Sequence, residues 1–294
     1  MKTRKIQRFL LLCPLLQSSA GYGTVFRKEA VSLDNINKTL YIPLCGKAFV
    51  SKRGILLHDP MAEAIWEQQG FPLKGTAKSK WLAYYMGMRA AVFDRWLVAR
   101  LEEAPETLVI QIGCGLDSRV HRLGVRGHLW YDVDFPEVIR ERRRYYAESD
   151  HYHMLGADAR ECPWLHEMPL GRNTLVVLEG VSMYFRREEL LPLLAALTER
   201  FSGVSVLMDC YTVFAARASK YKNPINEVCV TQLYGVDRPE ELEAGTGLVF
   251  IGERELTPGW MTDQLAGFDR AFFRAVFTGA SAKKIYRLFE YEKK

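Results

Sequence analysis

The stretch Thr107-Leu-Val-Ile-Gln-Ile112, followed at once by Gly113-Cys-Gly-Leu-Asp-Ser-Arg119, decides the fold class of this chain. A nearly continuous apolar run is expected of a β-strand that is buried on both faces of a sheet. The two glycines directly after it let the backbone turn sharply and approach a ligand closely. The stretch therefore predicts the first strand and the ligand-binding turn of a Rossmann-like α/β core, with a helix starting at Ser118.

Around this stretch, segments typical of strands alternate with segments typical of helices. Further strands are expected at His128–Val133, His151–Gly156, Thr174–Leu178, Val204–Met208, Leu248–Glu255 and Lys284–Glu292. Helices are expected at Pro60–Gly70, Ser79–Glu103, Phe135–Ser149 and Arg187–Phe201. The alternation indicates a parallel, doubly wound sheet that binds ligands at the carboxyl ends of its strands. We expect a mostly parallel, seven-stranded sheet flanked by helices, with a helical N-terminal part and an inserted helical cap.

The composition is that of a globular protein and indicates no metal or nucleic-acid site. The net charge of +5 comes from Lys and Arg spread along the chain. The densest basic cluster, Arg140 and 142–144, lies on an expected helix and is interpreted as a solvated face rather than a nucleic-acid patch. No C-x-x-C pair or Cys/His cluster at metal spacing occurs among the six cysteines, so reduced thiols and no metal are expected. These cysteines are Cys13, Cys45, Cys114, Cys162, Cys210 and Cys229.

The residues after Gly113 and Gly115 indicate which cofactor the glycine turn binds. A dinucleotide-binding loop has a third glycine and an uncharged helix start, because the pyrophosphate rests on the helix N-terminus. Here the third position is Ser118, and Asp117 places a negative charge where a phosphate would lie. This favours a cofactor with an ammonium and a sulfonium, S-adenosylmethionine, over NAD. Asp117 as a plain helix N-cap is the alternative, and both roles are compatible.

Acidic residues follow the next two expected strands. Asp132 and Asp134 lie about twenty residues after Gly113, the spacing of a carboxylate that accepts hydrogen bonds from the ribose hydroxyls. Either residue fits this role, and Asp134 also fits a cap of the helix at Phe135. Asp158-Ala159 is placed to meet the adenine through a carboxylate and a backbone N–H, although a turn-forming Asp fits equally.

Glu179 and Tyr184 follow the fourth expected strand, where the reacting methyl group should lie. An isolated buried carboxylate is costly without a partner. The sulfonium, or a hydrogen-bond donor on the cofactor, is one such partner for Glu179. We therefore predict that Glu179 and Tyr184 line the catalytic pocket, with core packing as the alternative for Tyr184.

Taken in order, these motifs resemble the leucine carboxyl methyltransferase family, which includes polyketide carboxyl O-methyltransferases of the tetracenomycin type. The resemblance runs from about Asn37 to the C-terminus. Its markers are Thr39–Ala48, Asp59-Pro60, the helix of Arg89, Ile112–Arg119, Tyr131–Pro136, Ala157-Asp158 and Glu179–Tyr184.

The resemblance implies that the chain is a class I S-adenosylmethionine-dependent methyltransferase. It also implies a specific role for each of several residues. Arg89 matches the family arginine that pairs with the methionine carboxylate of the cofactor. The other implied contacts are Gly113 with the methionyl part, Asp134 with the ribose, Asp158 and Ala159 with the adenine, and Glu179 as the acidic residue of the cofactor site. The sequence departs from the family at Cys45-Gly46, so no contact is assigned to Lys47.

Residues 1–25 are expected to form a leader or extended N-terminus without a counterpart in the family. Basic residues before the apolar run Phe9–Leu16 give it the outline of a secretory signal, but the run is short and contains Pro14, so it cannot span a membrane. A surface helix or extended start and a cytoplasmic location are expected, because the cofactor is kept inside cells. Residues 26–294 are expected to form one domain. Its parts are an N-terminal helical part (26–105), a cofactor-binding core (106–210), a cap (211–246) and the final strands (247–294).

The expected reaction is an in-line methyl transfer to a small-molecule carboxylic acid, with proximity and orientation as the main contributions of the enzyme. A carboxylate is ionised at neutral pH and needs no general base, which agrees with histidines that lie outside any motif. The expected pocket residues are Tyr211, Phe214, Arg217, Tyr221 and Lys222, where Arg217 or Lys222 would pair with the substrate carboxylate or remain a solvated charge. Trp81, Trp96, Trp130 and Trp260 are expected in the core.

No nucleic-acid or membrane partner is expected. An NAD(P)-dependent oxidoreductase and a non-catalytic S-adenosylmethionine-binding protein remain the alternative functions.

Overall fold

The strands form one seven-stranded sheet in the computed structural model. The structure describes residues 33–69, 79–124, 127–219 and 232–294. All five residues of the first strand are buried, as a strand covered on both faces requires. The strands are β1 (Leu108–Ile112), β2 (Leu129–Asp134), β3 (Tyr152–Gly156), β4 (Asn173–Leu178), β5 (Gly203–Tyr211), β6 (Leu248–Arg254) and β7 (Tyr286–Lys293).

The order of the strands places a ligand-binding crevice at one end of the sheet. The order is β3-β2-β1-β4-β5-β7-β6, with β1 to β5 parallel and β7 antiparallel to both of its neighbours. The chain reverses its direction of winding between β1 and β4. In open α/β sheets, the carboxyl ends of the strands at such a switch point form the binding crevice. The predicted fold class, a mostly parallel seven-stranded Rossmann-like sheet, is confirmed.

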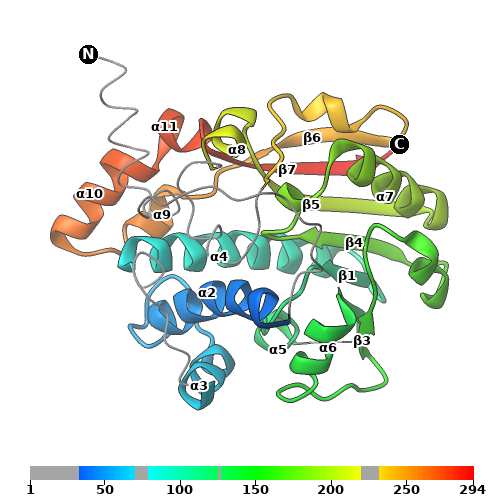
Figure 1. The fold of residues 1–294 in the computed structure, drawn as a ribbon, viewed down its shortest axis with the longest axis horizontal. Helices are drawn as coiled ribbons and strands as arrows, with labels where there is room; N and C mark the ends of the chain where they lie inside the picture. The colour runs from blue at the N-terminus through cyan, green and yellow to red at the C-terminus, as the bar shows by residue number, and fades with distance from the viewer. Residues whose placement is uncertain (1–32, 70–78, 125–126, 220–231) are drawn as a thin grey trace, which may run out of the picture.

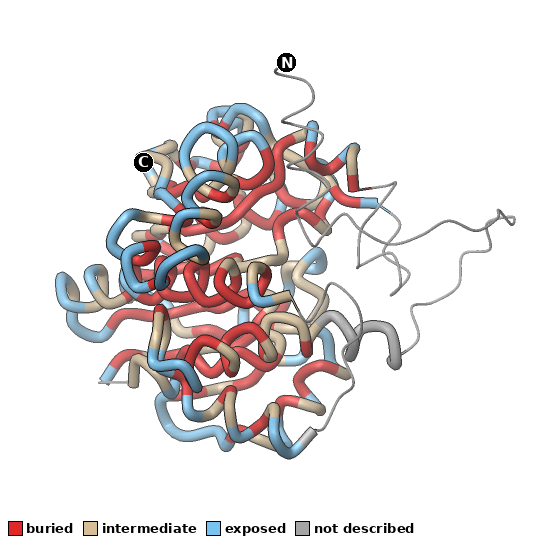
Figure 2. Tube along the Cα trace, turned by 90° about the vertical axis from the view of Figure 1, so that its left-hand side faces the viewer, coloured by how far each residue is buried: buried red, intermediate tan, exposed pale blue. Residues whose placement is uncertain are grey.

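Helices cover both faces of the sheet, so the core has two layers (Figure 1). One layer packs under α4, with Trp96 and Val177 among its buried side chains. The other packs under α7, with Leu178 and Leu193. Figure 2 shows the buried segments running through the middle of the molecule and the exposed ones at its outer turns. The helices are α2 (Leu33–Ser51), α3 (Pro60–Gln69), α4 (Lys80–Glu103), α5 (Arg119–Leu123), α6 (Pro136–Arg142), α7 (Arg187–Arg200), α8 (Val213–Ser219), α9 (Gly259–Thr262), α10 (Gly267–Phe277) and α11 (Gly279–Lys283), with short 3-10 turns η3 (Cys162–Glu167), η4 (Ser182–Tyr184) and η6 (Pro239–Leu242).

Three sequence-based expectations about the fold are wrong. The helix expected from Phe135 to Ser149 ends at Arg142. Arg142 is fully buried and not part of a solvated basic face, because it pairs with a buried carboxylate of β2. Trp260 is 44% exposed rather than part of the core.

Besides α2, the described residues form three helices, α9 to α11, that the sequence analysis did not predict. They lie between β6 and β7 and contain only 4, 11 and 5 residues. Two of the three are too short for an apolar repeat to show in the sequence. The expected domain boundaries remain predictions, and Tyr221, Lys222 and the 1–25 leader lie outside the described residues.

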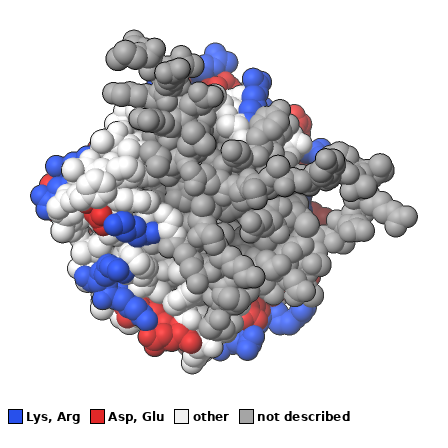
Figure 3. Space-filling model, turned by 60° about the vertical axis from the view of Figure 1, so that its left-hand side comes forward, with Lys and Arg blue, Asp and Glu red and all other residues white. Residues whose placement is uncertain are grey.

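The structure describes four of the six cysteines and the charged side chains around them. Basic and acidic side chains lie next to one another on the face shown in Figure 3. Within the described ranges, Cys45, Cys114, Cys162 and Cys210 form no disulfide, and no group of three His, Cys, Asp or Glu residues could hold a metal ion. The described helices include none with the length and apolar character that a membrane span needs.

Candidate active site

The glycine turn after β1 adopts the conformation that its sequence predicts. Gly113 and Gly115 have φ angles of +69° and +52°, in the left-handed region that favours glycine. A Cβ on Gly113 would lie 2.6 Å from Cγ2 of Val181, so the turn packs directly against the segment that follows β4. The backbone N–H of Gly113 donates to the carbonyl of Val133 (2.8 Å), which joins the turn to the end of β2.

The structure separates the two candidate ribose ligands, Asp132 and Asp134. Asp132 is fully buried and accepts hydrogen bonds from Arg142, Trp130 Nε1 and Tyr152. Both of its carboxylate oxygens are therefore occupied by side chains of the core. Asp134 lies at the end of β2. Its carboxylate accepts the backbone N–H of Gly115 (2.8 Å) and of the following residue (2.8 Å).

Only Asp134 of this pair is therefore placed beside the glycine turn. Burial raises its pKa to about 6. It does not cap helix α6, whose N-cap is Phe135. Its contact with the ribose remains a prediction.

Glu179 is not an isolated carboxylate, because two arginines hold it. Arg89 Nε lies 3.0 Å from Glu179 Oε1, and Arg119 Nη2 donates to Oε2. Burial alone would favour the protonated acid, but the charges of Arg119 and Arg89 outweigh it and lower the pKa of Glu179. The sequence analysis expected the partner to come from the cofactor, and the protein itself supplies two.

Arg89 is fixed from a second side by residues of β5 and β7. Its Nη1 lies 3.1 Å from the hydroxyl of Tyr286 and 3.4 Å from Asp209 Oδ2. Tyr286 donates to the same Asp209 oxygen (2.5 Å), and the backbone N–H of Gly180 also donates to Asp209. Burial raises the pKa of Asp209 to about 6. Arg89 is therefore held in one orientation over the loop that follows β4.

Asp117 forms contacts with cations rather than with the helix it precedes. The N-cap of α5 is Ser118, so the N-cap alternative for Asp117 is wrong. Its carboxylate lies 2.8 Å from Lys47, 3.0 Å from Arg119 and 2.9 Å from Arg122. Burial opposes its ionisation, yet these cations hold the pKa of Asp117 well below its usual range. A direct contact between Asp117 and a cofactor remains a prediction.

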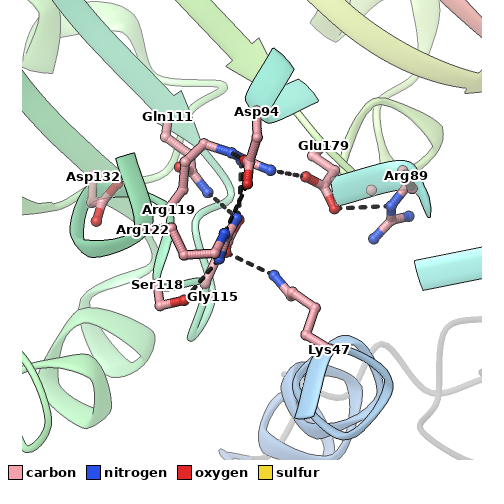
Figure 4. A network of polar contacts seen from close by, with 12 residues as sticks. Lys47, Arg89, Asp94, Gln111, Gly115, Ser118, Arg119, Arg122, Asp132 and Glu179 are labelled. Atoms are coloured by element: carbon pink, nitrogen blue, oxygen red, sulfur yellow. Dashed lines mark hydrogen bonds and ion pairs between the residues drawn. The ribbon is translucent and has the colours of Figure 1, made fainter. Parts of the chain in front are cut away.

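These ion pairs join into one buried network between α2, α4 and the sheet (Figure 4). In that view, Lys47 reaches from α2 towards the arginines, and Glu179 lies between Arg119 and Arg89. The network contains four cations and five carboxyl groups, so it carries more acids than bases. The members are Lys47, Arg89, Arg119, Arg122, Asp59, Asp94, Asp117, Glu179 and Asp209.

The donors and acceptors at this site fit S-adenosylmethionine. Buried polar atoms are nearly always paired, with protein, water or a ligand. Gln111 Oε1 is buried without a hydrogen-bond partner, and the same side chain donates from Nε2 to Asp117. This oxygen can accept a hydrogen bond from an ammonium group. The excess of carboxyl groups suits a cofactor with a net positive charge and disfavours a diphosphate.

The remaining candidate residues lie at the same edge of the sheet or near it. Asp158 follows β3 and pairs with Arg160 (2.6 Å), which lowers the pKa of Asp158, and Ala159 beside it is half-buried. Tyr184 lies in η4, and burial raises its pKa to about 12. Arg217 lies exposed on α8, and its pairing with a substrate remains a prediction, as do the adenine contact of Asp158 and Ala159 and the catalytic role of Tyr184.

Sequence reasoning missed the residues that position the site. Arg119 stood in the quoted glycine motif, yet nothing local shows that it meets Glu179, 60 residues later. Tyr286 and Asp209 meet through the pairing of β5 with β7, which the sequence does not reveal. Lys47 received no role, although its burial beside Asp117 joins it to the network.

Comparison with known proteins places the chain in a family. Residues 37–198, more than half of the chain, match the leucine carboxyl methyltransferase family. The tetracenomycin polyketide synthesis O-methyltransferase TcmP of Streptomyces glaucescens is 29% identical over 218 residues, which cover 74% of this chain and 81% of that protein. The S-adenosyl-L-methionine-dependent methyltransferase dpfgK of Gibberella zeae is 28% identical over 244 residues, covering 75% and 82%.

One solved structure supports the fold. Magnesium protoporphyrin IX methyltransferase from Synechocystis PCC 6803, solved with bound S-adenosylhomocysteine, superposes with a TM-score of 0.50 at 13% identity, covering 79% of this chain and 93% of that one. The sequence match, the sheet order and the site agree. The chain therefore belongs to the leucine carboxyl methyltransferase family and is an S-adenosylmethionine-dependent methyltransferase.

Proposed function

We propose that this enzyme transfers the methyl group to the carboxylate oxygen of a small organic acid and forms a methyl ester. S-adenosylmethionine, when bound, supplies an electrophilic methyl group on a positively charged sulfur. The O-methyltransferase named among the relatives supports an oxygen acceptor, and the name of the family supports a carboxyl group.

The observation that carries the proposal is the low basicity of Glu179 and Asp117. Two arginines lower the pKa of Glu179, and three cations lower that of Asp117. A carboxylate with a depressed pKa is a poor general base at neutral pH. The remaining carboxylate beside Arg89, Asp209, has a pKa raised to about 6, but both of its oxygens already accept hydrogen bonds within the protein, from Gly180 and Tyr286. Such a site suits an acceptor that arrives already ionised.

The residues of the site act by binding and orienting. Asp134 accepts hydrogen bonds from the ribose hydroxyls, and Arg89 pairs with the methionine carboxylate. Arg119 and Arg89 hold Glu179 beside the cofactor, while Tyr184 and Glu179 border the position of the reacting methyl group. Catalysis then rests on alignment of the acceptor oxygen, methyl carbon and sulfur, together with exclusion of water.

The proposal is tested by the chemical nature of the methylated product. The purified enzyme is incubated with methyl-labelled S-adenosylmethionine and pairs of acceptors that differ only in carrying a carboxylate or a hydroxyl, such as 2-naphthoate and 2-naphthol. Transfer to the acid, with label released as methanol by mild alkali, is the expected result. A label that survives alkali, or transfer to the hydroxyl partner alone, would identify an ether-forming enzyme and contradict the proposal. Binding of S-adenosylhomocysteine without transfer to any acceptor of a broad panel would favour the non-catalytic alternative.

A further inference from the structure

A cavity of about 280 Å³ lies beside the end of β5, away from the ion-pair network. Several of its lining side chains belong to the core layer under α7, namely Phe185, Leu190, Cys210 and Leu242. Arg89 and Glu179 lie on the other side of the sheet, against α4 and Arg119. The cavity is therefore a second site and not part of the cofactor crevice.

Among the described residues that line this cavity, one cation has no counter-charge. Arg187 and Glu241 both line it and form an ion pair at 3.3 Å, so they neutralise each other. Arg217, which also lines it, projects from α8, is exposed, and has no ion pair or hydrogen bond with any described residue. The described lining residues, two arginines and one glutamate, therefore carry a net positive charge.

The inner wall of the cavity is apolar. The aromatic ring of Phe185 and the aliphatic side chains of Leu190 and Leu242 form much of it. Burial raises the pKa of the Cys210 thiol to about 12, so this residue is uncharged and behaves as a small hydrophobic group. An apolar wall below a single cation is complementary to a molecule with an apolar body and one negative charge.

We propose that this cavity binds a small organic anion, with its apolar body against Phe185 and its carboxylate on Arg217. The volume lies just below the range of roughly 300–1,000 Å³ that is typical of sites for drug-sized ligands, so a body of one or two rings fits. The inference does not depend on the identity of the methyl acceptor.

The test measures binding of 2-naphthoate, and of the uncharged 2-naphthamide, to the full chain by calorimetry. 2-Naphthoate should bind at a site from which S-adenosylhomocysteine does not displace it, in addition to any binding as a methyl acceptor. Arg217→Gln should weaken binding at that site at least tenfold while the affinity for S-adenosylhomocysteine is unchanged. 2-Naphthamide should bind the wild type and Arg217→Gln equally. Arg95→Gln, which removes an exposed arginine from α4, is the matched control and should leave 2-naphthoate binding unchanged.

Two results would overturn the inference. Equal affinity of Arg217→Gln and Arg95→Gln for 2-naphthoate would show that Arg217 does not bind the anion. Displacement of 2-naphthoate by S-adenosylhomocysteine would place the acid in the cofactor crevice. This experiment measures binding and not methyl transfer. If the enzyme does not methylate acids, the comparison of the variants and the displacement by S-adenosylhomocysteine can still be measured.

Discussion

At the scale of single residues, Arg89 tests the cofactor contact most directly. Arg89→Lys keeps a positive charge beside Glu179 and Asp209 but loses the planar group that contacts both. A charge-assisted hydrogen bond contributes about 1.5–3 kcal/mol, and about 1.4 kcal/mol corresponds to a tenfold change in affinity. The affinity for S-adenosylhomocysteine, measured by calorimetry, should therefore fall at least about tenfold. Arg95→Lys on the same helix should leave it unchanged, and equal affinities of the two variants would remove Arg89 from the cofactor site.

Asp134 should make cofactor binding depend on pH. Its pKa of about 6 means that the carboxylate becomes protonated as the pH falls from 7.5 to 5 and then accepts the ribose hydroxyls less strongly. The dissociation constant of S-adenosylhomocysteine should rise over this range. Asp134→Asn should bind more weakly at pH 7.5 and show a flat profile.

Thermal stability distinguishes weaker cofactor binding from unfolding. As the pH falls, the affinity should fall, whereas the stability that Asp134 contributes should rise. A carboxyl whose pKa is raised in the folded state contributes stability at low pH and loses that contribution as the pH rises through about 6. Weaker binding at pH 5 should therefore occur without a loss of this group's contribution to the melting temperature. Asp209 also titrates near pH 6, so Asp209→Asn is the control and should retain the pH dependence. A flat profile in Asp209→Asn would assign the titration to that residue instead.

At the scale of elements, the turn after β1 and the segment after β4 depend on each other. Gly113→Ala forces a Cβ into left-handed backbone at about 1–2 kcal/mol and against Val181 at about 1–3 kcal/mol. Urea unfolding should show Gly113→Ala to be destabilised by both contributions. Adding Val181→Ala should recover part of the second contribution but none of the first, because Cγ2 of Val181 is removed while its Cβ still lies 2.9 Å from the new Cβ. If the losses in the free energy of unfolding caused by Gly113→Ala and Val181→Ala simply add in the double variant, then packing against Val181 is not the reason that position 113 needs glycine.

Prediction from the sequence succeeded where an element is determined locally. The apolar run of β1 and the glycines after it are contiguous, and so are the carboxylates at the end of β2. The ion pairs of Arg89 and Arg119 were not predictable, because their shared partner lies 90 and 60 residues away along the chain. Pro43 inside α2 likewise concealed that helix, since proline normally interrupts a helical pattern.

At the scale of the whole molecule, the described sheet and the network need the chain only from α2 onward. Deleting residues 1–25 should therefore leave the far-ultraviolet circular dichroism and the affinity for S-adenosylhomocysteine unchanged. Deleting residues 1–51 removes α2 with Lys47 and leaves Asp117 with fewer cations. Removing one member of a buried ion pair costs about 3–5 kcal/mol, so this longer deletion should lower the melting temperature and the affinity. A loss of binding in the shorter deletion would show that the leader contributes to the site.

The position of β7 has a consequence for biosynthesis. This strand is the last of the seven in sequence, yet it lies between β5 and β6 and forms every backbone pairing of β6. While the protein is being synthesised, β6 emerges from the ribosome before the strand it pairs with, and β5 keeps one unpaired edge. Unpaired strand edges on nascent chains are prone to aggregate. The final assembly of the sheet therefore waits for residues 286–293, and chaperone demand during translation should be greatest just before they appear.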